Sequence, residues 1–250
     1  MTDIIFTDQL NLDAELENLA KRYKNAGRLG IQVLNLIGTR AEGLLCRLPK
    51  PISEQLNYVT WIALEQALLA ATKSRKWLPD QSDWLNTVVG TAMGAVGGVG
   101  GLPSALAELP VTTTLMLRII EGVAVEYGFD PMVKSVRLEC LHVFSSAGPF
   151  EHDDGSDITF LSTRLMFTGE VVQTVIARVA PRLSTVMGQK LAAQTVPVLG
   201  AVAGAATNFA YSNYYTDMAH VHFGMHRLAL KLNIPNIELV EMLRDRVLIR

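Results

Sequence analysis

Apolar residues recur along the chain at steps of three and four, whereas alternation at steps of two holds for only a few positions at a time. The first spacing lines one face of an α-helix, and the second would line one face of a strand. The pattern therefore predicts an all-α protein, folded as a single multi-helix domain. Helices are expected at residues 8–25, 31–48, 54–72, from 84 through a glycine-rich run that ends at 101, around 108, at 110–127, 131–144, 158–179, 183–193 and 197–230, and from 235 onward.

Prolines and capping residues set the expected helix boundaries. Ser53 is placed to cap the third helix, and Pro110 is expected to open a helix because its missing N–H costs nothing in a first turn. Gly128 can supply a left-handed helix end, and Asp130 can cap the next helix. Pro181 is expected to stop the helix before it, since proline cannot continue a helix without the loss of a hydrogen bond.

Two of the expected helices carry small residues at steps of four, which places those residues on one ridge of each helix. Such ridges allow two backbones to approach closely. The sequence therefore predicts a tightly crossed pair of glycine-rich helices at the centre of the domain. The first ridge consists of Gly90, Gly94 and Gly98, and the second of Gly200, Gly204 and Asn208, continued by Ser212 and Thr216.

Asn208 is expected to be buried on the second ridge, where an unpaired side-chain amide would cost ~1–3 kcal/mol. We predict that this amide bonds to groups near residues 98–103, where the crossing helix breaks. The alternative is that Asn208 caps a kink in its own helix.

The chain has few charges for a soluble protein. Charged residues make up 18% of it, against ~25% in typical soluble proteins, and none occurs in residues 84–107 or 191–216. Such a chain must either bury an unusually large share of its residues or rest some of them against a membrane lipid surface or an apolar partner. Glycines, asparagines and prolines in both runs disfavour true membrane spans. Lys plus Arg number 22 and Asp plus Glu number 24, so a role in nonspecific nucleic-acid binding is excluded.

The N-terminal segment is acidic and lacks the basic and apolar regions of a secretory signal, which indicates a cytoplasmic protein. Cys46 and Cys140 stand far apart, with no CxxC spacing, and are expected to be reduced thiols in the core.

A basic and aromatic cluster follows the third expected helix. It would suit an anchor on anionic lipid headgroups at the inner face of a membrane. The other interpretation is a solvated helix C-terminus, where positive charge is favourable. The cluster consists of Lys73, Arg75, Lys76 and Trp77.

Catalytic motifs of the GxSxG and GxxxxGK types do not occur in the sequence. One group of residues has metal-like spacing: Asp217, His220, His222 and His226. His222 and His226 are four apart on one helix face, as two zinc ligands require, while Asp217 and His220 share another face. Because the glutamate of an HExxH motif is missing, we expect ordinary histidines, with no catalytic residue, metal or cofactor. A metal-assisted hydrolase built on these four residues is the alternative.

Several separated motifs stand in order along the chain: Gly100-Gly101-Leu102-Pro103, Glu108-Leu109-Pro110, Tyr127-Gly128-Phe129-Asp130 and Pro197-Val198-Leu199-Gly200, with Gly204, Asn208, Ala219, Phe223 and Arg227. Together they resemble the EcsC protein family. The resemblance covers about residues 56–230, so we divide the chain into an N-terminal helical arm, 1–50, and an EcsC-like helical domain, 51–250. Glu108 stands where the family pattern has aspartate.

The resemblance implies a functional context, because the family takes its name from a gene beside an ABC transporter linked to exoprotein secretion. It implies no catalytic residues. Together with the low charge, it leads us to expect a non-enzymatic protein, peripheral on the inner face of the cytoplasmic membrane. Such a protein would bind lipid or an apolar segment of a transporter or secretion partner. A soluble regulatory helical bundle is a second alternative.

Overall fold

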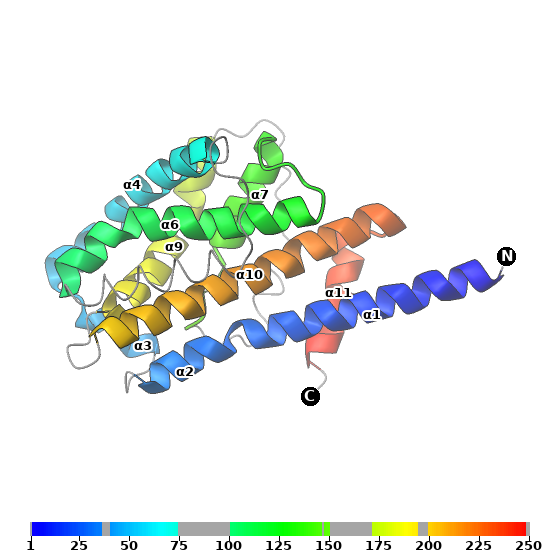
Figure 1. Cartoon of the computed structure of the whole chain (residues 1–250), viewed down its shortest axis with the longest axis horizontal. Helices are drawn as coiled ribbons and strands as arrows, with labels where there is room; N and C mark the ends of the chain where they lie inside the picture. The colour runs from blue at the N-terminus through cyan, green and yellow to red at the C-terminus, as the bar shows by residue number, and fades with distance from the viewer. Residues whose placement is uncertain are drawn as a thin grey trace.

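The computed structural model of the chain describes residues 2–36, 41–74, 101–146, 148–150, 172–194 and 200–248. Every regular element in these ranges is helical, which confirms the predicted all-α class, and Figure 1 shows the helices packed together as one elongated domain. The elements are α1 (Thr2–Ala26), α2 (Arg28–Leu36), α3 (Ala41–Leu44), the 3₁₀ helix η1 (Leu45–Arg47), α4 (Lys50–Ser74), α6 (Gly101–Glu126), α7 (Lys134–Phe144), α9 (Val172–Gln194), α10 (Gly200–Leu232) and α11 (Asn236–Leu248).

The long helix α10 organises the packing. It contacts α1, α2, α6, α7, α9 and α11, and it runs beside α6 in the same direction (Figure 1). Its buried side chains face several of these neighbours at once, which is the pattern of a central helix. Tyr211, Tyr215 and Phe223 are fully buried, and the Tyr215 ring meets Phe144 of α7 edge to face at 4.9 Å.

The N-terminal helices lie against α10 and α11 and share the core of the rest of the chain. Leu16, Leu19 and Tyr23 of α1 and Val33 of α2 belong to one hydrophobic cluster with residues of α4, α6, α7, α9, α10 and α11. The described helices therefore form a single helical domain.

The end of α6 has the predicted left-handed glycine. Gly128 has φ +85°, its N–H donates to Val125 O at 2.9 Å, and the next N–H, of Phe129, donates to Ala124 O at 2.9 Å. This pair of bonds is a Schellman motif. Asp130 accepts from the N–H of Met132 at 2.8 Å, but it closes a turn, because α7 begins only at Lys134.

Two predicted helix boundaries are wrong, because Pro110 lies inside α6 and Pro181 lies inside α9. A proline inside a helix loses one backbone hydrogen bond and costs ~3 kcal/mol. In both helices a hydroxyl bonds back to the proline carbonyl: Thr114 Oγ1 to Pro110 O and Ser184 Oγ to Pro181 O, each at 2.7 Å. Burial of the apolar residues on both sides of each proline offsets the missing bond, so the helices continue.

Local geometry also changes the expected boundaries near residue 50. Ser53 is not a cap, since α4 begins at Lys50 and the Ser53 hydroxyl donates to Lys50 O at 3.0 Å. Pro51 falls in the first turn, where its missing N–H leaves no bond unmade. Within the helix expected at 31–48, the structure describes α2 to residue 36 and then α3 and η1 from residue 41. Cys46 of η1 is exposed, so its expected place in the core is wrong, whereas Cys140 is buried.

The predicted crossing of two glycine ridges remains a prediction. Gly90, Gly94 and Gly98 lie outside the described residues. On the second ridge, Gly200 is the first residue of α10 and Gly204 is buried one turn later.

Candidate functional site

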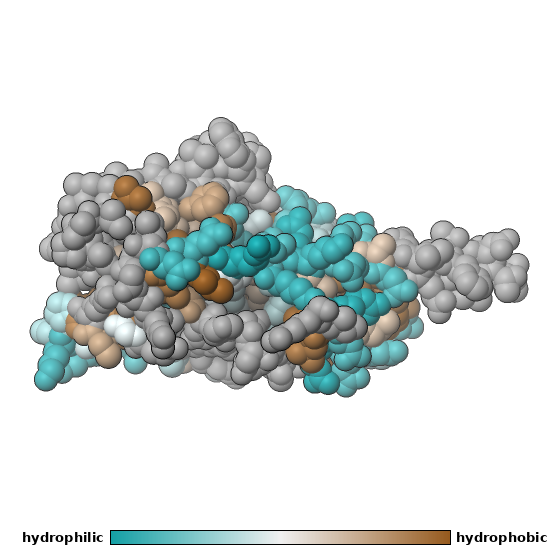
Figure 2. All heavy atoms as spheres, turned by 90° about the horizontal axis from the view of Figure 1, so that it is seen from below, coloured by the Kyte–Doolittle hydropathy of each residue, from teal (hydrophilic) through white to brown (hydrophobic). Residues whose placement is uncertain are grey.

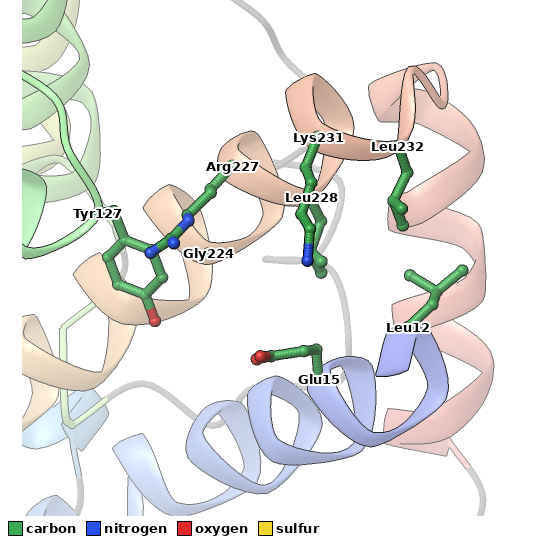
Figure 3. A pocket seen from close by; sticks show the side chains of 8 residues that line it. All are labelled: Leu12, Glu15, Tyr127, Gly224, Arg227, Leu228, Lys231 and Leu232. Atoms are coloured by element: carbon green, nitrogen blue, oxygen red, sulfur yellow. The ribbon is translucent and has the colours of Figure 1, made fainter. Parts of the chain in front are cut away.

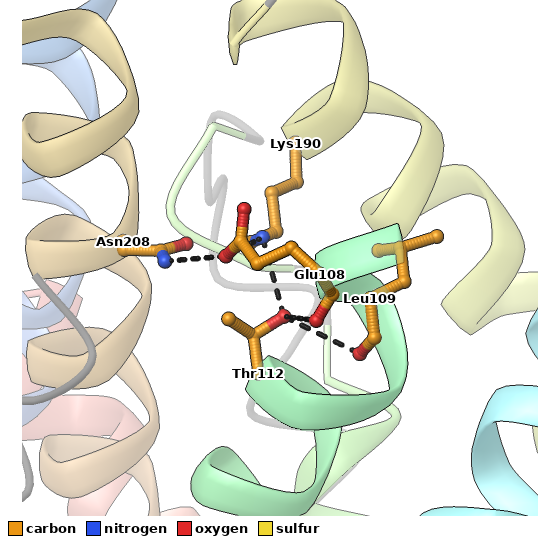
Figure 4. A network of polar contacts seen from close by, with 5 residues as sticks. All are labelled: Glu108, Leu109, Thr112, Lys190 and Asn208. Atoms are coloured by element: carbon orange, nitrogen blue, oxygen red, sulfur yellow. Dashed lines mark hydrogen bonds and ion pairs between the residues drawn. The ribbon is translucent and has the colours of Figure 1, made fainter. Parts of the chain in front are cut away.

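Three helices meet around a buried group of polar side chains, shown in Figure 4. Glu108 and Thr112 lie one turn apart on α6, Lys190 lies on α9 and Asn208 on α10. Lys190 Nζ is 3.2 Å from Glu108 Oε1 and donates to Thr112 Oγ1 at 3.4 Å. Asn208 Nδ2 donates to the same Glu108 oxygen at 2.8 Å. One carboxylate oxygen therefore joins α6, α9 and α10, and we call these four residues the Glu108 network.

The Glu108 network is shielded from water. Lys190 and Asn208 are 0% exposed and Glu108 is 5% exposed. Removing a charge from water costs several kcal/mol, which attraction and hydrogen bonds offset only when the geometry is good. Burial lowers the pKa of the Lys190 ammonium, and the Glu108 carboxylate opposes that shift. The network is therefore a clamp between helices rather than an open reactive centre.

Asn208 is buried, as its place on the second ridge led us to expect. Its bond to Glu108 is charge-assisted, and such bonds are roughly twice as strong as those between neutral groups. Of the residues 98–103 with which contacts are predicted, 98–100 lie outside the described residues and 101–103 form the start of α6, so these contacts stay a prediction.

The predicted metal cluster is divided between two sides of α10. Asp217 pairs with Arg22 of α1 at 2.9 Å, and His220 Nδ1 lies 3.3 Å from the Tyr127 hydroxyl. His222 and His226 instead share a partner on α7. Within the described ranges, no group of three or more His, Cys, Asp or Glu side chains has an arrangement that could hold a metal ion. The hydrolase alternative stays a prediction.

The partner of His222 and His226 is Glu139. Its Oε2 accepts from His222 Nε2 at 3.2 Å and from His226 Nδ1 at 3.0 Å. Burial raises the pKa of Glu139, but the two histidine hydrogen bonds and charges outweigh burial and hold that pKa at about 2, below the ordinary 4.5. The carboxylate is thus stabilised in its ionised form between α7 and α10.

This cluster should make stability fall in acid. Since the folded-state pKa of Glu139 is depressed, its contribution is complete above the unfolded value of 4.5 and is lost as pH falls towards about 2. At 1.36 kcal/mol per pKa unit, the shift of the Glu139 pKa contributes at most ~3 kcal/mol to the free energy of unfolding. In urea unfolding, the stability difference between wild type and Glu139→Gln should be larger at pH 5.5 than at pH 3. An unchanged difference would contradict the assignment, and Glu54→Gln, an exposed carboxylate on α4, controls for the lost charge.

A cavity of about 120 Å³ opens between α1 and the C-terminal part of α10. Its walls combine charged and apolar side chains with one phenol and one glycine (Figure 3). The lining residues are Leu12, Glu15, Tyr127, Gly224, Arg227, Leu228, Lys231 and Leu232. We call this cavity the α1–α10 pocket.

The predicted lipid anchor lies largely outside the described residues. Lys73 belongs to the last turn of α4, but nothing is described of its side chain, and Arg75, Lys76 and Trp77 follow the described range. The anchor therefore stays a prediction.

Sequence reasoning missed the partners that come from distant helices. Lys190 carried a usable signal, because it is a lone charge among Val186, Met187 and Leu191 on a helix with apolar spacing. Glu139 had no such signal, since nothing local connects it with histidines more than eighty residues later. The α1–α10 pocket was also missed, because its two walls come from opposite ends of the chain.

Sequence comparison with known proteins identifies the family of the chain. The model of the EcsC protein family matches residues 64–228, about two thirds of the chain. The chain belongs to the EcsC protein family. It is also similar to the uncharacterized protein YdbA of Bacillus subtilis (strain 168), with 30% identity over 159 residues. That alignment covers 58% of this chain and 55% of YdbA, so the chain spans about half the length of this relative. No solved structure matches the chain.

Proposed function

We propose that this protein is a non-enzymatic, peripheral membrane protein whose exposed apolar residues on α6 and α10 contact lipid. The supporting observation is their exposure: Val202 and Phe209 of α10 are 57% and 40% exposed, and Val111 and Val125 of α6 are 51% and 42% exposed. Large apolar side chains that remain in water in groups often mark contact surfaces.

Helical spacing places the two exposed apolar residues of each helix on one face. On α6 the half-buried Arg118 lies midway between them on that face. Val202 and Phe209 are seven residues apart, and Val111 and Val125 are fourteen apart, so each pair returns to one face of its helix. The α10 pair also lies within the uncharged run 191–216. The Glu108 network joins α6 to α10 at this level of the two helices and fixes their relative positions.

The face on which α1 lies is less suited to lipid. Figure 2 views the side on which α1 lies, and hydrophilic residues run across the middle of that face. Among the described helices, none is both long enough and apolar enough to cross a membrane. Contact through side chains at the surface of the domain is consistent with both observations.

The predicted anchor and the family context extend the proposal. Lys73, Arg75, Lys76 and Trp77 would add contacts with anionic headgroups, which makes binding sensitive to salt. The transporter and secretion context that the EcsC resemblance implies makes an apolar segment of a membrane protein the other candidate for this surface.

Vesicle binding tests the proposal. We expect the protein to sediment with vesicles of phosphatidylcholine and phosphatidylglycerol, and we expect Val202→Gln with Phe209→Gln to weaken that binding about tenfold. The reason is that burying such partly exposed side chains in lipid contributes on the order of 1 to 2 kcal/mol in total.

The matched control is Leu230→Gln with Ile237→Gln, which removes exposed apolar residues beyond the uncharged run. This pair should leave vesicle binding unchanged. Equal losses in the two double variants, or no sedimentation of the wild type, would contradict the proposed surface.

A further inference from the structure

The α1–α10 pocket has the features of a binding site for a small polar ligand. Its volume of about 120 Å³ far exceeds the ~10–15 Å³ that one water molecule needs. A ligand group of several non-hydrogen atoms can therefore enter between the two helices.

Charged side chains face one another across this space. Arg227 and Lys231 are four residues apart on α10 and share one face, and Glu15 stands opposite them on α1 (Figure 3). Within the described part of the chain, none of the three forms an ion pair or a side-chain hydrogen bond. Two cations and one anion thus line the pocket without neutralising each other through direct contact.

Tyr127 adds a neutral hydrogen-bond donor to the same wall. Burial raises the pKa of its phenol, and nearby Glu15 and Glu126 act in the same direction, while Arg22 and Arg227 oppose it. The phenol therefore keeps its proton. Its oxygen lies 3.3 Å from His220 Nδ1, and when that nitrogen carries the hydrogen of this contact the phenol can donate its own proton to an anion. Arg227, Lys231 and Tyr127 together present three donor side chains, which suit the several acceptor oxygens of a phosphate.

Glu15 limits which anion can bind. A simple phosphate would lie close to its carboxylate and be repelled, whereas a ligand that also carries an ammonium group would pair with it. Leu12, Leu228 and Leu232 line the pocket at the end nearest Leu12 and suit a short carbon chain (Figure 3).

We propose that the α1–α10 pocket binds a phosphoethanolamine group, with its phosphate on Arg227 and Lys231 and its ammonium on Glu15. This chemistry can come from free phosphoethanolamine or from the headgroup of phosphatidylethanolamine. The inference goes beyond the proposed apolar contact, because the pocket can bind the free compound in a protein that ignores vesicles.

Calorimetric titration of the full chain tests the proposal. Free phosphoethanolamine should bind saturably, and at least tenfold more tightly than inorganic phosphate or ethanolamine alone. Arg227→Gln should weaken phosphoethanolamine binding at least tenfold. Glu15→Gln should remove the preference for phosphoethanolamine over inorganic phosphate. Lys21 is an exposed charged residue of α1 outside the pocket, so Lys21→Gln should change neither the affinity for phosphoethanolamine nor the preference over inorganic phosphate.

Vesicles distinguish the two sources. We compare vesicles that contain phosphatidylethanolamine with vesicles of phosphatidylcholine, whose methylated amine cannot donate to Glu15. A preference for phosphatidylethanolamine that Glu15→Gln abolishes assigns the pocket to the headgroup, and binding of the free compound without such a preference assigns it to a soluble ligand. The proposal is overturned when neither form binds, or when folded Arg227→Gln and Glu15→Gln proteins bind like the wild type.

Discussion

Replacing Glu108 with glutamine is expected to destabilise the protein by about 3–5 kcal/mol, the usual result of removing one partner of a buried ion pair. Lys190 is fully buried, and its ammonium lies 3.2 Å from the Glu108 carboxylate. Glutamine keeps the size of the side chain but removes the charge that compensates the ammonium. The midpoint of urea unfolding should fall, with little change in the slope of the transition.

The double variant Glu108→Gln with Lys190→Met separates the ion pair from the shape of the core. Because the second substitution removes the uncompensated ammonium, it should recover most of the lost stability. Glu126→Gln, an exposed change on the same helix, should stay within ~0.5 kcal/mol of the wild type. A Glu108→Gln protein as stable as the wild type would contradict the clamp.

Replacing Gly30 with alanine should lower the free energy of unfolding by a similar amount, about 3 kcal/mol or more. A methyl group at Gly30 of α2 would lie 1.7 Å from the carbonyl oxygen of Pro149 and 2.4 Å from its carbon. These are backbone atoms, so no side-chain rotation relieves the clash, and α2 or the 148–150 segment must move. Overpacking of this kind typically costs 1–3 kcal/mol, and more where the backbone has to shift.

Gly27→Ala is the matched control for the Gly30 substitution. No neighbouring atom lies within 4 Å of a methyl group placed there, and its φ is not positive. Thermal unfolding should therefore show a large loss of stability for Gly30→Ala and none for Gly27→Ala. Similar melting temperatures for the two variants would mean that α2 does not pack on Pro149 as described.

The fold class could be predicted because helical signals in this chain are local. The apolar spacing located α7 and α10 to within a few residues. It also placed most of α6 and α9 in helices, although it divided each of them at its proline. The left-handed conformation of Gly128 could also be predicted from the sequence, since glycine adopts a positive φ without the clash of a Cβ. In each case the residues that determine the structure are neighbours in sequence.

Tertiary packing overrode the local signals at Pro110 and Pro181. Each proline weakens a helix by a fixed local amount, but buried neighbours such as Leu109 and Leu183 hold the two halves of the helix in line. Sequence alone indicates the free-energy cost of the missing backbone hydrogen bond. It does not show how far burial of the neighbouring apolar side chains offsets that cost. A helix boundary at proline is therefore a reasonable expectation that a well-packed core can reverse.

The candidate sites depend on contacts that no local pattern contains. Asn208 could be singled out because a polar residue on a small-residue ridge needs a partner. Its described partner, Glu108, is a hundred residues away, and the link to Lys190 required the placement of a third helix. The α1–α10 pocket was even harder to predict from sequence, since Glu15 and Arg227 belong to opposite ends of the chain.

The central claim is that this member of the EcsC family works at a membrane surface without spanning it. Fractionation of cells that express the full chain into soluble, high-salt-extractable and detergent-requiring pools tests this most directly. The account predicts recovery in the high-salt wash, because headgroup charges and partly exposed apolar side chains hold the protein at the surface. Recovery entirely in the soluble pool, or release only by detergent, would contradict it.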